Sequence, residues 1–239
     1  MKGAAGAALA AGWSLPALAP IVPAVAMALR IPTRASAPGG VAITFDDGPH
    51  AEGTPAVLER LDAAQARATF FLVGEQVERM PALAAEIVAA GHRVAVHGHR
   101  HRNTLRLPPG AIAADLDRAL DVIADATGVR PVLHRPPYGI YSWPSLAAVR
   151  ARGWTPVLWS RWGRDWRRSA TGPGVAALVA DGVGAGDVLL LHDADHYSAP
   201  ESWRATAAAL PRVLDTVAAA GLAPVPLASG ADLAQPSGR

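Results

Sequence analysis

The chain has 239 residues, 51% of them hydrophobic, which is enough for one domain with a full apolar core. Its formal net charge of +2 is too small to indicate a nucleic-acid partner, for which a concentrated basic stripe is expected. There is no cysteine, so disulfides and thiolate metal sites are excluded. Any metal ion would need histidine and carboxylate ligands.

The first 39 residues differ in composition from the rest of the chain. Lys2 precedes an uncharged, alanine-rich stretch from Gly3 to Leu29, which exceeds the ~20 residues that a helix needs to cross a bilayer but contains three prolines. A positive start, an apolar middle and small residues near the end are typical of secretory signals. We predict that residues 1–39 form a signal peptide or membrane anchor plus linker, which contacts the membrane. The protein would then be extracytoplasmic, either membrane-anchored or secreted. The alternative is a buried apolar segment of the domain itself.

Beyond this segment, short β-rich apolar runs alternate with longer segments rich in Ala and Leu. The runs that predict strands are Val41–Phe45, Ala68–Val73, Val94–His97, Pro131–His134, Pro156–Ser160, Val188–His192 and Ala223–Leu227. The segments that predict helices are Thr54–Ala64, Gln76–Ala90, Gly110–Thr127, Ser145–Arg152, Val175–Val183 and Ser202–Ala220. This alternation predicts an α/β fold with parallel strands inside and helices outside. Seven strands favour a distorted (β/α)7 barrel, with an open doubly wound sheet as the competitor.

Residues of the kinds that form active sites follow the predicted strands. They are Asp46, Asp47, His97, His101, Arg135, Asp165, Trp166 and His192. The carboxyl ends of the strands of a parallel barrel form one face, and active sites are built on that face. We therefore expect these residues to converge on one pocket.

Two of these segments predict a metal site. The adjacent acids Asp46 and Asp47 indicate one metal ligand and one general base, because neighbouring carboxylates repel each other, although a turn with capping acids is the alternative. His97 and His101 with one carboxylate would leave coordination positions open, as catalytic zinc sites require. His99 would be the ligand in a strictly extended segment, and a solvated basic loop is the alternative to any metal site.

His192 ends an apolar run on the same predicted face. Imidazole titrates near neutrality, so this side chain could protonate a leaving amine. We interpret the remaining histidines outside the metal segment as structural or surface residues: His50, His92, His134 and His196. Substrate contact by His196 and Tyr197 is left open.

An aromatic segment lies between the predicted fifth and sixth strands. It holds Trp159, Trp162 and Trp166, flanked by Arg161, Arg164, Arg167 and Arg168. Exposed aromatic rings of this kind could line a sugar-binding groove, and core packing is the alternative.

Over residues 41–227 the chain resembles the polysaccharide deacetylases of carbohydrate esterase family four, with their nodulation-protein-type deacetylase domain. Five segments carry the resemblance: TFDDGP at Thr44–Pro49, the His-x-x-x-His pair at 97 and 101, RPPYG at Arg135–Gly139, the Asp165-Trp166 pair, and Leu190-x-His192. The resemblance implies a distorted (β/α)7 barrel as the catalytic domain, over residues 40–228. A flexible tail over residues 229–239 and a monomer are expected.

The resemblance also implies a divalent metal ion. Asp47, His97 and His101 would hold it. Zinc is the expected ion, with Co²⁺, Ni²⁺ and Mn²⁺ as alternatives. Asp46 would be the general base, held in place by Arg135.

The same resemblance assigns roles on the substrate side of the site. His192 would protonate the departing amine, and Asp165 would orient it. The backbone N–H of Tyr138 would help to stabilise the oxyanion. Trp166 and Leu190 would form an apolar slot for the acetyl methyl group.

Three positions depart from the family pattern. Gly98 replaces the usual Ser or Thr after the first metal histidine, which removes a possible hydroxyl partner. Trp162 stands where an acid often begins the fourth motif, and His99 is an additional histidine. These departures concern the choice of substrate and metal more than activity.

The sequence thus predicts a hydrolase that removes N-acetyl groups from N-acetylglucosamine-type glycans, peptidoglycan or chitin-like, with release of acetate. The partner would be an acetylated polysaccharide. An O-acetyl esterase acting on xylan or another polymer is the enzymatic alternative. A glycan-binding module with an inactive site is the alternative from a different class.

Overall fold

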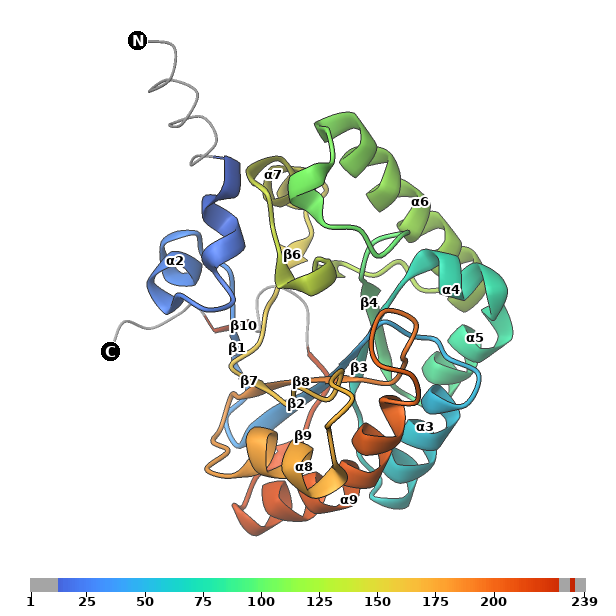
Figure 1. The fold of residues 1–239 in the computed structure, drawn as a ribbon, viewed down its shortest axis with the longest axis vertical. Helices are drawn as coiled ribbons and strands as arrows, with labels where there is room; N and C mark the ends of the chain where they lie inside the picture. Colours follow the sequence, from blue (N-terminus) through green and yellow to red (C-terminus); the bar gives the residue numbers. More distant parts are fainter. Residues whose placement is uncertain (1–12, 228–232, 235–239) are drawn as a thin grey trace.

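The computed structural model describes residues 13–227 and 233–234, and its centre is one curled parallel sheet (Figure 1). Its strands are β2 (Gly40–Asp46), β3 (Thr69–Leu72), β4 (Arg93–Val96), β5 (Leu133–His134), β6 (Thr155–Pro156), β7 (Arg161–Trp162) and β8 (Val188–His192). They lie in the order β6-β5-β4-β3-β2-β8-β7, and β9 (Ala223–Pro224) pairs with the start of β2. The predicted distorted (β/α)7 barrel is confirmed.

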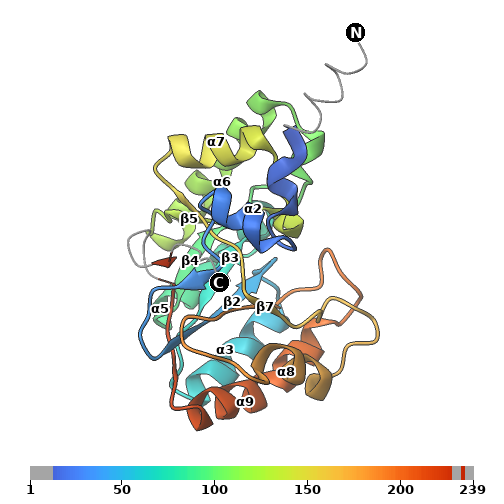
Figure 2. The same cartoon turned by 90° about the vertical axis from the view of Figure 1, so that its left-hand side faces the viewer.

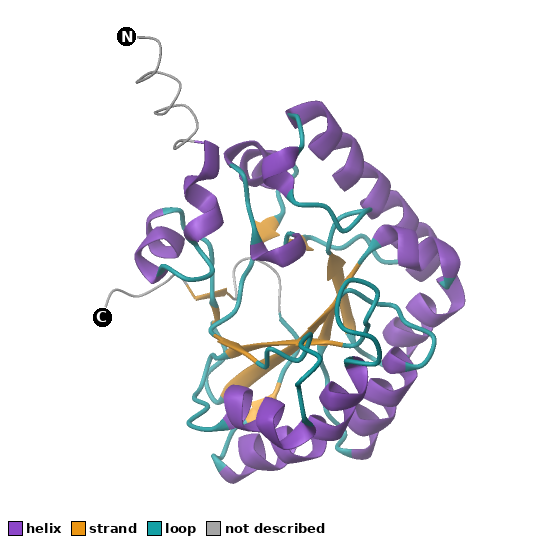
Figure 3. Ribbon diagram, in the orientation of Figure 1, coloured by secondary structure: helices purple, strands orange, loops and turns teal. Residues whose placement is uncertain are grey.

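Helices cover the outside of the curled sheet, as Figure 3 shows by colour. They are α3 (Gly53–Ala63), α4 (Gly74–Arg79), α5 (Pro81–Ala89), α6 (Pro109–Thr127), α7 (Trp143–Ala151), α8 (Gly172–Ala180) and α9 (Trp203–Ala219). Short 3-10 turns follow β4 (η2, Thr104–Arg106) and β5 (η3, Pro137–Gly139). Gly128 ends α6 in the left-handed conformation, with φ of 72°, as a helix-terminating glycine should.

The hydrophobic core is built around β2, which lies in the middle of the sheet. All seven residues of this strand are buried, and the apolar residues of β8 beside it are buried as well. A parallel strand covered on both faces is expected to read as a nearly continuous apolar run. The polar residues Thr44, Asp46 and His192 stand out for this reason.

Three local predictions differ from the structure. The helix predicted over residues 76–90 is two helices, because Pro81 has no N–H and Met80 before it leaves the helical region (φ −136°, ψ 58°). Thr54 does not cap α3, since its hydroxyl bonds instead to His50 and Asp193. The strand predicted over residues 156–160 is replaced by the two short strands β6 and β7.

The described part of the N-terminal segment packs against the barrel (Figure 2). It contains η1 (Leu15–Leu18), α2 (Pro23–Ala28) and β1 (Arg34–Ala35). Ala19, Ala26 and Ile31 are buried in the same core as the sheet, and the N–H of Leu158 donates to the carbonyl of Pro32 at 2.9 Å. The segment therefore contributes to the described domain. None of the helices in the described part of the chain is long and apolar enough to span a membrane.

The predicted tail lies mostly outside the described residues. Within it, Leu233–Ala234 form β10, which pairs antiparallel with β1. Export and a flexible tail stay predictions.

Candidate active site

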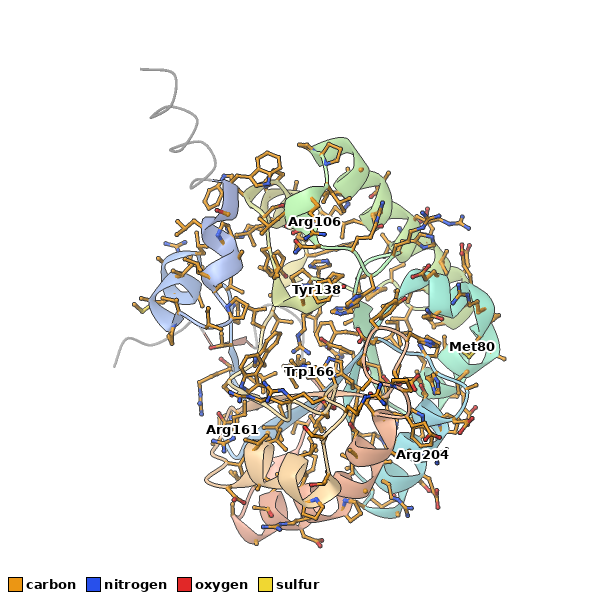
Figure 4. The ribbon with its side chains drawn as sticks, viewed as in Figure 1. Met80, Arg106, Tyr138, Arg161, Trp166 and Arg204 are labelled. Carbon is orange, nitrogen blue, oxygen red and sulfur yellow. The ribbon has the colours of Figure 1, made fainter. Side chains whose placement is uncertain are left out.

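A cavity of about 350 Å³ opens at the carboxyl ends of the strands. Its lining includes eight of the ten predicted site residues: Asp46, Asp47, His97, His101, Tyr138, Trp166, Leu190 and His192. The other two, Arg135 and Asp165, lie directly behind Asp46 and His192. Figure 4 shows Tyr138 and Trp166 at this end of the barrel. The predicted convergence on one pocket is present in the structure.

The sheet register places the two proposed proton-transfer groups opposite each other. Asp46 ends β2, His192 ends β8, and these residues are Cα partners in the parallel pair. Asp47 follows at once with φ of 80°, a left-handed conformation that is uncommon for a residue with a side chain. Because of this turn, the two adjacent carboxylates point in different directions and can have different chemical roles.

Three side chains that are suitable metal ligands form a compact cluster. The Oδ1 atom of Asp47 lies 3.3 Å from Nε2 of His97 and 3.2 Å from Nε2 of His101. Nδ1 of His97 donates to the carbonyl of Arg135 at 2.8 Å, which leaves its Nε2 lone pair free for a cation. Oδ1 of Asp47 is buried without a hydrogen-bond partner. The donor set and this orphaned oxygen fit a divalent metal ion.

The charge state of Asp47 also suits a ligand. Burial alone would raise its pKa, but the contacts with His101 and His97 hold the pKa far below its ordinary value. The carboxylate is thus ionised at neutral pH. His101 is held by aromatic rings, since Tyr197 stacks on it at 4.1 Å and Tyr138 meets it edge-on at 4.5 Å.

Asp46 is fixed by a buried arginine. Nη1 of Arg135 donates to Oδ1 of Asp46 at 2.7 Å and to Oγ1 of Thr44 at 2.9 Å. Nη2 donates to the carbonyl of Leu158, and the guanidinium lies over the ring of Phe71 at 4.0 Å. Burial lowers the pKa of Arg135, and the adjacent Asp46 opposes this shift, so the two groups stabilise each other's charge.

His192 is oriented by Asp165. Nδ1 of His192 donates to Oδ1 of Asp165 at 2.9 Å, while the His192 backbone N–H and the Thr206 hydroxyl both donate to Oδ2 at 2.6 Å. Burial would lower the pKa of His192, but the Asp165 carboxylate outweighs it, with help from Asp47 and Asp46, and raises the pKa to about 10. The imidazole is therefore protonated at neutral pH, with Nε2 left for a substrate.

Aromatic rings form one wall of the cavity. Trp159, Trp162 and Trp166 follow one another with ring centroids 5.9 and 5.7 Å apart, and Trp166 meets His192 edge-on at 5.5 Å. Leu190 lies in the same lining. Trp162, which replaces an acid of the family pattern, makes this wall apolar rather than charged.

The alternative in which His99 binds the metal is wrong. Gly98 has φ of 82°, so the segment is not extended and His99 turns away from the cavity. Its N–H donates to Asp115 at 2.8 Å, and its ring faces Glu78. The same backbone angle explains the departure at Gly98, because a residue with a side chain would be strained there.

The remaining histidines act structurally. Burial lowers the pKa of His92 to about 4 and of His134 to about 3, so both are neutral. His50, Asp195 and His196 also lie together. However, Nδ1 of His50 accepts the Gly53 N–H at 2.9 Å, so Nε2 carries the proton that it shares with Asp195. This tautomer does not offer a lone pair to a cation at Nε2.

Several residues that support the site carry no clear signal in their sequence context. Tyr197, whose contact with substrate the sequence does not decide, lines the cavity. Its hydroxyl donates to Glu75 and accepts from Gln76. Thr206, on α9, holds Asp165, and nothing in its sequence context indicates this. Asp193 is completely buried behind the Gly48 turn, where a Cβ on Gly48 would come within 2.5 Å of its carboxylate.

Asp193 should make stability fall as the pH rises. Burial raises its pKa to about 7 against the opposing hydrogen bond from Thr54, so the folded state binds a proton more tightly than the unfolded state does. The loss of folding stability caused by ionising the buried Asp193 is absent below about pH 4 and complete above about pH 7. Asp193→Asn should remove it, so the melting-temperature difference between variant and wild type should grow from pH 5 to pH 8. Both proteins are compared in excess chelator.

The exposed Asp125 on α6 provides the matched control. Asp125→Asn should shift the melting curve equally at every pH. A constant difference between Asp193→Asn and wild type across this range would contradict the assignment.

Comparisons with known proteins agree with this geometry. The family model described as polysaccharide deacetylase matches residues 34–157, more than half of the chain. A chitooligosaccharide deacetylase of Bradyrhizobium sp. (strain ANU 289) is 38% identical over 157 residues, which cover 64% of this chain and 70% of the relative. A peptidoglycan-N-acetylglucosamine deacetylase of Bacillus cereus is 35% identical over 158 residues, covering 64% and 72%.

Solved structures show the same fold. A family 4 carbohydrate esterase from Streptomyces lividans in complex with acetate has a TM-score of 0.74 at 31% identity, covering 83% of this chain and 97% of that one. A family 4 acetyl xylan esterase from Clostridium thermocellum, in complex with a cobalt ion, has a TM-score of 0.70 at 30% identity, covering 78% and 87%. The chain belongs to the polysaccharide deacetylase family and is a hydrolase of the metal-dependent carbohydrate esterase type.

Proposed function

We propose that this protein removes N-acetyl groups from N-acetylglucosamine-type glycans and releases acetate. The observation that carries this proposal is the arrangement of the Asp46 carboxylate, paired with Arg135, and the protonated imidazole of His192 around a two-histidine, one-carboxylate cluster in one cavity. Amide hydrolysis needs this combination, because a base must activate water and an acid must protonate the amine before it can leave.

The protein's own residues divide the work. Asp46, held by Arg135, takes the proton from the attacking water. His192 gives its Nε2 proton to the departing amine, and Asp165 keeps the ring in the required orientation. Asp47, His97 and His101 would hold the metal ion, which when bound polarises the acetyl carbonyl and lowers the pKa of water. Zinc suits two imidazoles and one carboxylate with open positions, and Co²⁺, Ni²⁺ and Mn²⁺ are the alternatives.

The remaining cavity residues fit an acetylated sugar. We assign support of the oxyanion to the backbone N–H of Tyr138, which lines the cavity in a left-handed conformation with φ of 61°. Trp166 and Leu190 enclose the methyl group, and the rings of Trp159 and Trp162 offer a face to the sugar.

We also propose that the enzyme works outside the cytoplasm as a monomer. The alanine-rich stretch after Lys2 supports export or anchoring. In the described part of this segment, Leu15, Leu18, Ile21 and Met27 are exposed, which would suit contact with a membrane surface.

The function is tested by measuring acetate release from N-acetylglucosamine oligomers and from acetylated xylan, with and without chelator. We expect release from the N-acetylated oligomers, a loss of at least about 100-fold in excess chelator, and recovery when zinc is added back. Undiminished activity in chelator would contradict the metal site. Release from xylan alone would identify an O-acetyl esterase, and binding of oligomers without release would identify a glycan-binding module.

A further inference from the structure

Two loops beside the cavity carry exposed arginines that have no hydrogen-bond or ion-pair partner in the described part of the chain. The β4 loop, residues 98–107, supplies His101 to the cavity, and the β7 loop, residues 163–168, supplies Trp166. The exposed arginines of these loops are Arg100, Arg106, Arg164, Arg167 and Arg168. Among the described residues, none of these five side chains forms a hydrogen bond or an ion pair. In Figure 4, Arg106, Tyr138 and Trp166 follow one another across this end of the barrel.

Exposed arginines on the outer helices and turns of the barrel usually have an acidic partner. Arg118 pairs with Glu78 on the neighbouring helix, and Arg204 pairs with Glu201 at 3.0 Å. Arg93, at the amino end of β4, is exposed and, like the loop arginines, has no hydrogen-bond or ion-pair partner among residues 13–227, but it lies at the end of the strand away from the cavity. It therefore provides a matched control.

Arg102 of the β4 loop pairs with Asp115, but among the described residues the five exposed arginines have no acidic partner. The β4 loop contains no Asp or Glu, and the β7 loop contains only Asp165, which is buried and bonded to His192. Among the cavity acids, Asp46 is paired with the buried Arg135. The cavity is therefore flanked by positive charge on two sides, which raises the local concentration of anions.

The backbone of the β7 loop supports a binding role. Arg164 has φ of 50°, a left-handed conformation that costs energy for any residue with a Cβ atom. Its guanidinium lies 5.3 Å from the centre of the Trp162 ring, which lines the cavity. Strained residues concentrate at ligand-binding sites, where binding repays the strain.

We propose that the substrate is an anionic N-acetylated glycan, in which carboxylate or phosphate groups on the units next to the reacting sugar contact the arginines of the β4 and β7 loops. This inference rests on the proposed N-deacetylase function and specifies its substrate class. The guanidinium group suits either anion, because its fixed fork of N–H donors matches two oxygens at once.

An anionic bilayer is the competing partner for these arginines. The glycan is favoured because the arginines flank the cavity itself. By contrast, exposed apolar side chains that would enter a bilayer, such as Leu18 and Ile21, lie on the N-terminal segment.

The test compares kcat/KM for oligomers of equal length that are neutral, carboxylated or phosphorylated on the units beside the N-acetylated sugar. At low salt we expect the anionic substrate to exceed the neutral one by at least about tenfold. The ratio of kcat/KM for the anionic substrate to kcat/KM for the neutral one should fall toward one in 0.5 M salt, because salt screens exposed charges. It should also fall toward one in the triple variant Arg164→Gln, Arg167→Gln, Arg168→Gln. Arg93→Gln should keep the wild-type ratio. A preference in either anionic arm supports the proposal and identifies the anion.

A wild-type ratio near one in both arms, or an unchanged ratio in the triple variant, would overturn the inference. So would loss of binding to phosphatidylglycerol vesicles in the triple variant with an unchanged substrate ratio, which would assign the arginines to a membrane. Acetate release from the neutral oligomer with a ratio near one leaves the proposed function standing. If no acetate is released, calorimetric affinities of the same oligomers give the ratio independently.

Discussion

Asp46→Asn should lower kcat for acetate release by roughly 10²–10⁴-fold while the protein keeps its metal ion. The amide cannot accept a proton from water, but its size is nearly that of the carboxylate, and the cluster of Asp47, His97 and His101 is untouched. Mass spectrometry checks that the metal ion is retained, and steady-state acetate assays check that kcat is lowered. Asp47→Asn is the contrasting variant, because it should lose metal and activity together.

Stability must be controlled in this experiment, because Asp46 neutralises a buried charge. Arg135 is completely buried, and Asp46→Asn leaves its guanidinium with only neutral acceptors, which should cost about 3–5 kcal/mol of stability. Adding Arg135→Met should restore part of the melting temperature without restoring kcat. Undiminished acetate release by folded Asp46→Asn would sink the assignment of Asp46 as the base.

The sequence was sufficient for most of the site because parallel barrels impose one simple rule. Residues at the carboxyl ends of strands share a face, so the position of Asp46 after one apolar run and His192 after another predicts that they meet. The register between β2 and β8 then makes them partners. Residue type and spacing likewise predicted a metal site of His97, His101 and one carboxylate, and the resemblance to the deacetylase family assigned that carboxylate to Asp47.

The parts that sequence reasoning missed depend on backbone angles and long-range packing. The choice between His99 and His101 was decided by the φ angle of Gly98, and glycine alone does not indicate which conformation it adopts. The support of Asp165 by Thr206 joins the loop after β7 to α9, and a threonine in a helix carries no such signal. The burial of Ile31 likewise depends on long-range packing of the N-terminal segment, where the N–H of Leu158 donates to the carbonyl of Pro32, and no local pattern reveals it.

Asp165→Asn should move the alkaline limb of the pH profile of kcat/KM to lower pH by several units. In the wild type, the carboxylate of Asp165 raises the pKa of His192 to about 10 against the effect of burial. Without that charge, burial is opposed only by the smaller contributions of Asp47 and Asp46, so the pKa of His192 falls and the proton that the amine needs is lost at a lower pH. We expect a loss of roughly 10²–10³-fold at pH 8 and a smaller loss at pH 6.

The comparison between the two profiles carries this prediction, because a bound cation lowers the pKa of His192 in both proteins alike. Thr206→Val is the matched control, since it removes one hydrogen bond from Asp165 and leaves the charge in place. Its alkaline limb should lie close to that of the wild type. If Asp165→Asn instead lowers kcat/KM equally at every pH, Asp165 only positions the ring. If the limb moves as expected, the charge of Asp165 is what keeps His192 an acid at the pH where Asp46 must act as a base.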